Sequence, residues 1–266
     1  NLLILLSPAV SVAPIAAYAR IQRWVSYLPG MEKLGWTDVV SEFDPFKYNS
    51  FPVYAGEQIY QLTMALNKGF SGLTDQQLAD FPRVLAFQSI LDATIPPTSF
   101  TDALLNRLAG TPAELVVFDI NRYGALLPLL SDHGERLLDR LNATPTLGFD
   151  LTMVSNENPD SLQVAVSTRR AGSARWEQQN APAMRWPGNV YSLSHVALPF
   201  PPDDPLYGQR PASNNDALFL GEMAIQGERG LLKIPADWLL RLRYNPFYDY
   251  LERRTLDWVD GASNSD

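Results

Sequence analysis

The 266-residue sequence contains no cysteine, which excludes a disulfide framework, a thiolate nucleophile and a zinc or iron–sulfur site built on sulfur. It has only two histidines, His133 and His195, so any reaction that needs an imidazole must use one of them. Lysine and arginine total 21 against 29 acidic residues, a formal net charge of −8. Because duplex binding needs clustered cations, this acidic balance argues against a nucleic-acid partner.

Long apolar runs are also absent, since the opening run over residues 2–6 is closed at once by Ser7-Pro8. A membrane span needs about 20 apolar residues, and a secretory signal needs a basic start and a longer apolar stretch. Neither a membrane span nor a secretory signal is expected here. The run is typical of a buried parallel strand. A chain that begins on an interior strand looks cut, so we expect the natural protein to extend upstream of Asn1. The absence of cysteine fits the cytoplasm or the cell envelope equally well.

The composition is that of an ordinary globular protein, with 46% hydrophobic residues and enough length for one large core. After the first strand, buried strands are expected at 83–91 and 114–118, with a helix between them that ends at Gly110. An antiparallel hairpin is expected over 149–168. Together these features predict a single α/β domain whose mostly parallel sheet carries a helical insertion and a later antiparallel hairpin.

The insertion, over residues 9–80, is expected to be mainly helical and is dense in aromatic side chains. These aromatics indicate either a satellite core of packed helices or a lid over an apolar pocket. Further on, residues 171–189 are expected to form a loop, and 189–193 a short strand that runs into Ser194-His195. A last amphipathic segment, 236–259, is interrupted at Pro246.

Two residues meet the physical requirements of acyl transfer. Asp92 follows a buried strand, at the kind of strand end where ligands and catalytic groups collect in open α/β sheets. His195 follows the expected short strand and could act as a general base. The alternatives are that Asp92 caps a turn and that His195 is a structural residue in apolar surroundings. Asp119 also follows a strand and is a competing acid.

Five segments, taken in order, resemble the bacterial α/β-hydrolase family of serine esterases and lysophospholipase-like proteins: LLILLSPAV, EFDPFKYNSFPVYAGEQIY, LAFQSILDATIPP, LVVFDINR and YSLSHVALPFPPDDPLYG. The resemblance runs from Leu2 to about Gly208. It implies a strand that follows the nucleophile-bearing helix, then a cap, then the acid and the base of a triad. On that basis Asp92 matches the family acid and His195 the family base, in the order Ser…Asp…His.

The sequence departs from that family at the nucleophile. No G-x-S-x-G occurs, because Gly69-Phe70-Ser71-Gly72 is followed by Leu73. The elbow and the strand-loop of the oxyanion hole would both lie upstream of Asn1. Ser7 and Ser89 are expected to belong to strands without a strained turn, and Ser194 to diverge from its neighbour His195, so none is predicted to be the nucleophile.

The sequence therefore predicts the C-terminal portion of a serine hydrolase that acts on carboxylic esters, with lipid-like esters favoured by the aromatic cap. No cofactor and no metal are expected: His133 is interpreted as a solvated residue and Asp203-Asp204 as a polar turn. One rival is a hydrolase-like binding or scaffold protein without a nucleophile. The other is a complete non-catalytic domain in which Asp92 and His195 are unrelated.

Overall fold

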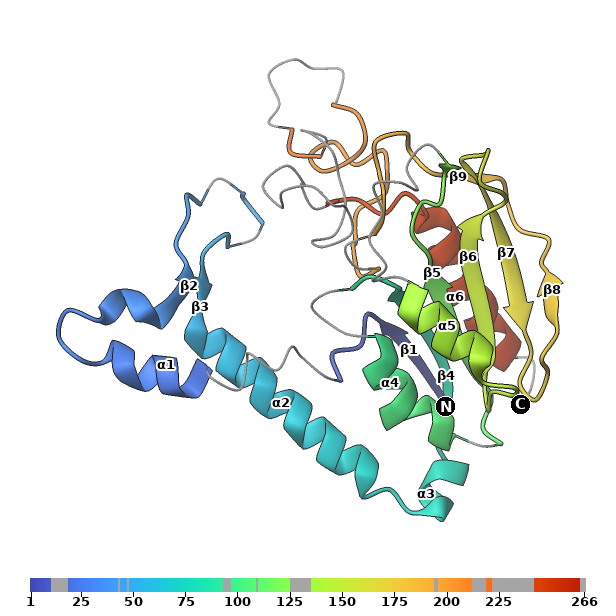
Figure 1. Cartoon of the computed structure of the whole chain (residues 1–266), viewed down its shortest axis with the longest axis horizontal. Coiled ribbons are helices and arrows are strands. Elements are labelled where there is room, and N and C mark those ends of the chain that lie inside the picture. Colours follow the sequence, from blue (N-terminus) through green and yellow to red (C-terminus); the bar gives the residue numbers. More distant parts are fainter. Residues whose placement is uncertain are drawn as a thin grey trace.

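A mixed sheet forms the centre of the computed structural model, which describes residues 1–10, 19–42, 44–46, 48–92, 97–108, 110–124, 135–193, 196–211, 219–221 and 242–263. Its strand order is β1-β4-β5-β6-β7-β8, and β9 also pairs with β7 (Figure 1). The strands are β1 (Leu2–Leu6), β4 (Arg83–Ser89), β5 (Ala113–Phe118), β6 (Asp150–Asn156), β7 (Gln163–Arg169), β8 (Trp176–Gln178) and β9 (Met184–Arg185). The first four pair in parallel, and β7 runs against β6, β8 and β9. The predicted α/β class with a mostly parallel sheet is confirmed.

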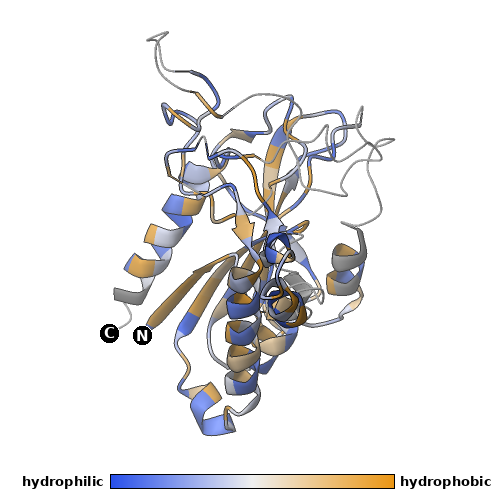
Figure 2. Ribbon diagram, turned by 90° about the vertical axis from the view of Figure 1, so that its left-hand side faces the viewer, coloured by the Kyte–Doolittle hydropathy of each residue, from blue (hydrophilic) through white to orange (hydrophobic). Residues whose placement is uncertain are grey.

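Helices cover both faces of the sheet, which explains why its central strands are continuous apolar runs. On one face, α4 (Pro97–Ala103), the short helix η3 (Leu105–Arg107) and α5 (Glu135–Ala143) pack over Leu115 and Val117. On the other, α6 (Tyr248–Ser263) packs over Val116 and Phe118. Figure 2 shows α6 standing on one side of the apolar strands and the other helices on the opposite side.

The sheet differs from the expectation in its second half. The hairpin predicted over 149–168 is present as β6 and β7, but β6 pairs in parallel with β5 and so extends the central sheet. The segment 171–189, expected to be a loop, contributes β8 and β9. The strand expected over 189–193 was wrong: only Val190 makes an isolated bridge, because Asn121 binds the carbonyl groups of Val190 and Tyr191.

Between β1 and β4 the chain forms a projecting unit, residues 19–71, that we call the arm (Figure 1). It consists of α1 (Ala19–Ser26), η2 (Glu32–Gly35), the antiparallel pair β2 (Trp36–Asp38) and β3 (Phe51–Pro52), and α2 (Val53–Ser71). The helix α3 (Asp75–Ala79) then leads back to the sheet, with a capping box between Thr74 and Gln77. The pair β2–β3 was missed, because its strands are only three and two residues long.

A buried carboxylate ties the arm to the body of the protein. Asp44, in the connection from β2 to β3, accepts hydrogen bonds from the Tyr207 hydroxyl and, at 2.6 Å, from Arg243 Nη1. Burial by itself raises the pKa of Asp44, but the bonds from Tyr207, from the backbone N–H of Phe46 and from Arg243 outweigh it, so the pKa lies below its ordinary value. Burial, together with Asp44, raises the pKa of Tyr207 to about 12.

None of the helices that the structure describes combines the length and the apolar character needed to cross a bilayer.

Candidate functional site

The carboxyl ends of the parallel strands bring polar side chains to one edge of the sheet. Ser7 follows β1, Ser89 ends β4, and Asp92 comes three residues later. Asp119 follows β5, and Ser155 lies near the end of β6. Since β1, β4, β5 and β6 are parallel neighbours in this order, the side chains form one row. This is the position at which ligands bind in open α/β sheets.

Asp92 sits in the turn that closes β4. Its backbone N–H donates to the Ser89 carbonyl at 3.4 Å, and the residue is 3% exposed. The preceding residue Ile90 is still bonded to β5, through the Phe118 carbonyl at 2.9 Å. The carboxylate is therefore held at the strand end by a rigid backbone, in surroundings with little access to water.

In the segment 190–196, residues 190–193 and 196 are bound at this edge of the sheet, at the ends of β5, β4 and β1. Asn121, after β5, donates from its side chain to the Val190 carbonyl at 2.9 Å. Next, Ser89 Oγ at the end of β4 donates to the Leu193 carbonyl at 2.8 Å. Finally, the Val196 N–H donates to Ser7 Oγ, after β1, at 3.1 Å. Three successive strand ends thus hold three successive points of the segment.

Ser7 corrects the sequence interpretation. It was expected to lack a strained turn, but its φ of 46° is in the left-handed region, the one such value for a non-glycine residue within the described chain. That region is unfavourable for residues with a Cβ, and strain of this kind concentrates at functional sites. The turn aims the hydroxyl at the Val196 N–H. Ser7 and Ser89 were therefore missed as anchors of the segment; the available signal was a serine at the end of each apolar run.

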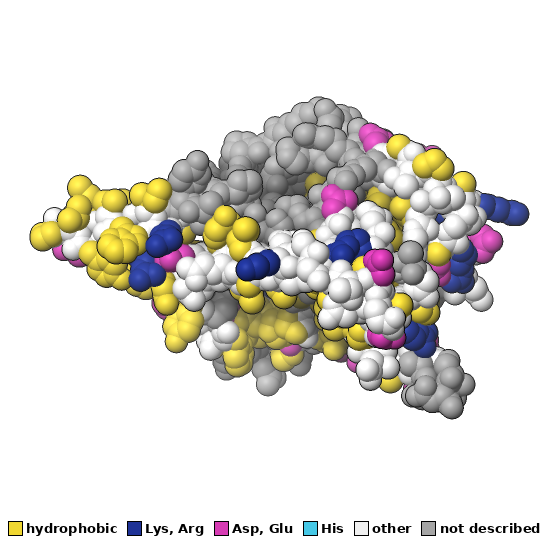
Figure 3. Space-filling model, turned by 90° about the horizontal axis from the view of Figure 1, so that it is seen from below, with side chains coloured by type: hydrophobic (Ala, Val, Ile, Leu, Met, Phe, Trp, Pro, Cys, Tyr) yellow, Lys and Arg dark blue, Asp and Glu magenta, His cyan; other side chains and the backbone are white. Residues whose placement is uncertain are grey.

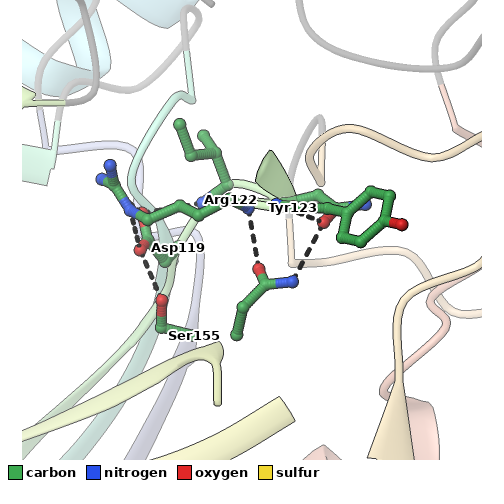
Figure 4. A network of polar contacts seen from close by, with 7 residues as sticks. Asp119, Arg122, Tyr123 and Ser155 are labelled. Carbon is green, nitrogen blue, oxygen red and sulfur yellow. Dashed lines mark hydrogen bonds and ion pairs between the residues drawn. The ribbon is translucent and has the colours of Figure 1, made fainter. Parts of the chain in front are cut away.

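Asp119 lies in a different environment, a closed polar network (Figure 4). Oδ2 accepts from Arg122 Nε at 2.5 Å and from Ser155 Oγ at 2.7 Å. Oδ1 accepts from Arg122 Nη2 at 3.0 Å and from the Ile120 N–H at 2.8 Å. A carboxylate offers about four acceptor sites, and these four bonds occupy them. Asn121 and Asn156 continue the network toward Tyr123.

The other predicted candidates are only partly within the structure. His195, Ser194 and His133 lie outside the described residues; the first two fall between the anchored residues Leu193 and Val196. Asp204 is described and forms the polar turn expected of it, accepting from the N–H groups of Leu206 and Tyr207 at 2.9 and 2.7 Å. Across the described part of the chain, no cluster of three or more His, Asp or Glu side chains could hold a metal ion.

No protein-family model, no curated protein and no solved structure matches the chain. Function is therefore inferred from the residues at this edge of the sheet.

The anchor role of Ser7 is directly testable. In Ser7→Ala the buried Val196 N–H loses its acceptor, and leaving such a donor unsatisfied costs about 1–3 kcal/mol. We expect the free energy of unfolding, measured by urea denaturation, to fall by about that amount. Ser26→Ala is the matched control, because Ser26 Oγ donates to the Arg23 carbonyl in a part-buried helix end, and we expect a loss of about 0.5 kcal/mol or less. Equal losses in the two variants would remove the anchor role.

Proposed function

We propose that the protein is the acid- and base-bearing part of a serine hydrolase that acts on carboxylic esters, with Asp92 as the acid and His195 as the base. The observation that carries the proposal is the anchoring of the segment on either side of His195. Leu193 is bound by Ser89, three residues before Asp92, and Val196 is bound by Ser7. His195 lies between these two residues in the sequence, and the proposal pairs its imidazole with the carboxylate that follows β4.

The alternative acid, Asp119, is disfavoured by its own hydrogen bonds. An acid that orients histidine must accept the imidazole N–H. All four acceptor sites of Asp119 are used by Arg122, Ser155 and a backbone N–H, so a bond to imidazole would displace one of them. Asp92 also follows the strand whose end carries Ser89, which binds Leu193, two residues before His195 in the chain.

Each group has a defined task in the proposed reaction. Neutral His195 removes the proton from a serine hydroxyl as it attacks the ester carbonyl, and then returns the proton to the leaving alcohol. Asp92 holds the imidazole in the required tautomer and stabilises the imidazolium. Since no G-x-S-x-G occurs among the 266 residues, the proposal takes the nucleophile and the oxyanion-hole donors from outside them. Ser7 is not assigned as the nucleophile, because its buried hydroxyl oxygen already accepts a hydrogen bond from the Val196 N–H.

The substrate class follows from the arm. We assign lipid-like esters, of the lysophospholipid or monoacylglycerol type, because the arm leaves the sheet between β1 and β4, whose carboxyl ends carry the site, and its surface is rich in apolar side chains. Aromatic side chains contact acyl chains over a large area at low cost in conformational entropy.

Histidine titration by NMR tests the pairing without needing the nucleophile. The chain has two histidines, so a His133→Gln spectrum assigns the imidazole signals. A carboxylate nearby favours the imidazolium, so we expect Asp92→Asn to lower the pKa of His195 by about one unit or more. Asp119→Asn is the matched control and should leave that pKa unchanged. An unchanged pKa in Asp92→Asn, or a fall confined to Asp119→Asn, would contradict the assignment.

A further inference from the structure

The arm presents an unusually apolar surface. Of the 21 large hydrophobic side chains that are exposed among the described residues, 17 lie in the arm. Figure 3 shows hydrophobic side chains gathered at the end of the molecule that α1 and the pair β2–β3 form. Apolar side chains exposed in such number mark an interaction site. Of the two alternatives for these aromatics, a satellite core finds no support in the described part of the arm, because Tyr27, Phe46 and Tyr48 are 71%, 76% and 89% exposed.

The helices of the arm expose large apolar side chains and bury some of their polar ones. In α1, Ile21 and Trp24 are one turn apart and are 63% and 66% exposed. In the same helix, Arg23 is directed toward α2, where its Nη1 forms an ion pair with Glu57 Oε2 at 2.7 Å.

The longer helix α2 repeats this arrangement. Its residues Ile59, Leu62 and Leu66, which share a face at helical spacing, are all exposed. Glu57 and Thr63, by contrast, are 5% and 2% exposed. A surface helix in water buries its apolar stripe and exposes its polar face. The outer face of α2 also carries the exposed side chains of Gln58, Gln61 and Lys68, and such a mixture of apolar and polar groups suits the boundary between lipid and water.

The composition of this surface favours lipid over a protein partner. Its aromatics include Trp24, Tyr27, Trp36, Tyr48 and Tyr54, and tryptophan and tyrosine are the residues that concentrate at membrane–water interfaces. The exposed side chains are spread over α1, β2, β3, α2 and their connections, a projecting tip and not one flat patch of the kind that pairs with a second copy.

The charge distribution also favours a lipid surface. Residues 19–71 contain five basic and five acidic residues, so the whole net charge of −8 belongs to the remainder of the chain. A neutral apolar arm on an acidic body is suited to a zwitterionic lipid surface, whereas an anionic surface would repel the body.

We propose that the arm docks on zwitterionic lipid–water interfaces, with its outward aromatic side chains entering the headgroup region. The ion pair Arg23–Glu57 stays inside the arm and holds α1 against α2. The tie from Asp44 to Arg243 keeps the docked arm attached to the body. This inference rests on the surface of the arm and does not require the proposed ester hydrolysis.

Vesicle flotation tests the proposal with the chain 1–266 and phosphatidylcholine vesicles as the probe. The test variant Trp24→Ser/Tyr48→Ser removes two exposed aromatics from the arm. The matched control Leu256→Ser/Val259→Ser removes two exposed apolar residues, 55% and 38% exposed, from α6. We expect the partition coefficient to fall at least tenfold in the test variant and to change less than twofold in the control. The single variant Tyr48→Ser, at an 89% exposed position, repeats the test with the smallest possible effect on folding.

Three results would overturn the proposal. The first is equal binding of the wild type and the arm variant, and the second is equal loss in the arm variant and the α6 control. The third is absence of vesicle binding together with a concentration-dependent dimer, seen by sedimentation velocity, that the arm variant abolishes; the surface would then be an interface between copies. Binding that strengthens when phosphatidylglycerol is added would contradict the choice of a zwitterionic surface.

Discussion

Replacing His195 with alanine, in a protein that also supplies the serine, is expected to lower kcat for ester hydrolysis by roughly 10⁴-fold or more. The imidazole acts by moving a proton in the transition state, so its loss reduces kcat while KM for the ester changes little. Steady-state hydrolysis of a monoacylglycerol and of a short water-soluble ester measures both constants. The lipid-like assignment further requires the monoacylglycerol to be the better substrate.

Two variants serve as controls for that experiment. His133→Ala should retain turnover, since His133 has no role in the proposed reaction. Asp92→Asn should lower kcat by about 10²–10⁴-fold, because the imidazole loses its tautomer partner. Retained turnover in His195→Ala would refute the assignment. A folded protein with the nucleophile position filled by a non-nucleophilic residue would favour the binding or scaffold alternative.

Removing the carboxylate of Asp44 is expected to give the largest stability loss among the polar variants of the arm. Its side chain is fully buried and is paired with Arg243 at 2.6 Å and with Tyr207. Breaking a buried pair on one side leaves the other charge uncompensated, which costs about 3 kcal/mol. We therefore expect Asp44→Ala to lower the free energy of unfolding by about that amount in urea denaturation at neutral pH. Asp38→Ala, an exposed carboxylate on β2, should have an effect of about 0.5 kcal/mol or less.

The same pair predicts a pH dependence. The folded pKa of Asp44 lies below its ordinary value, so its contribution to stability is fully present above the unfolded pKa of about 3.9. It is lost as the pH falls through the lower folded pKa. The difference in stability between the wild type and Asp44→Ala should therefore be constant near neutrality and shrink below about pH 4. A difference that stays constant down to pH 2 would show that the carboxylate is not paired.

The sequence predicts the central sheet well because apolar periodicity and turn chemistry act locally. The first strand has the predicted bounds, Leu2–Leu6. The helix expected to end at Gly110 is shorter, because α4 ends at Ala103 and η3 follows it, although Gly110 does have a positive φ of 94°. The two-residue strand β9, by contrast, exists because β7 offers it a partner edge, and no local pattern of so short a segment reveals that pairing.

The candidate site was predictable in its residue types and not in its contacts. Asp92 was found because it follows an apolar run. The anchoring of Leu193 by Ser89 joins residues more than 100 positions apart. No local pattern in either segment predicts this contact. The strain at Ser7 has the same origin, because its φ of 46° accompanies a bond to Val196, 189 positions further along the chain.

The insertion of the arm between two adjacent parallel strands has a consequence for how the protein can change. The chain leaves the sheet at Leu6 and returns at Arg83, a connection about three times as long as that between β4 and β5. Loop-closure entropy grows only with the logarithm of length, so the extra residues destabilise the β1–β4 pairing by about 1 kcal/mol. The stability of the sheet therefore depends only weakly on the length of the arm. Substrate preference or surface attachment can diversify there by insertion and deletion, while the geometry at the strand ends is preserved.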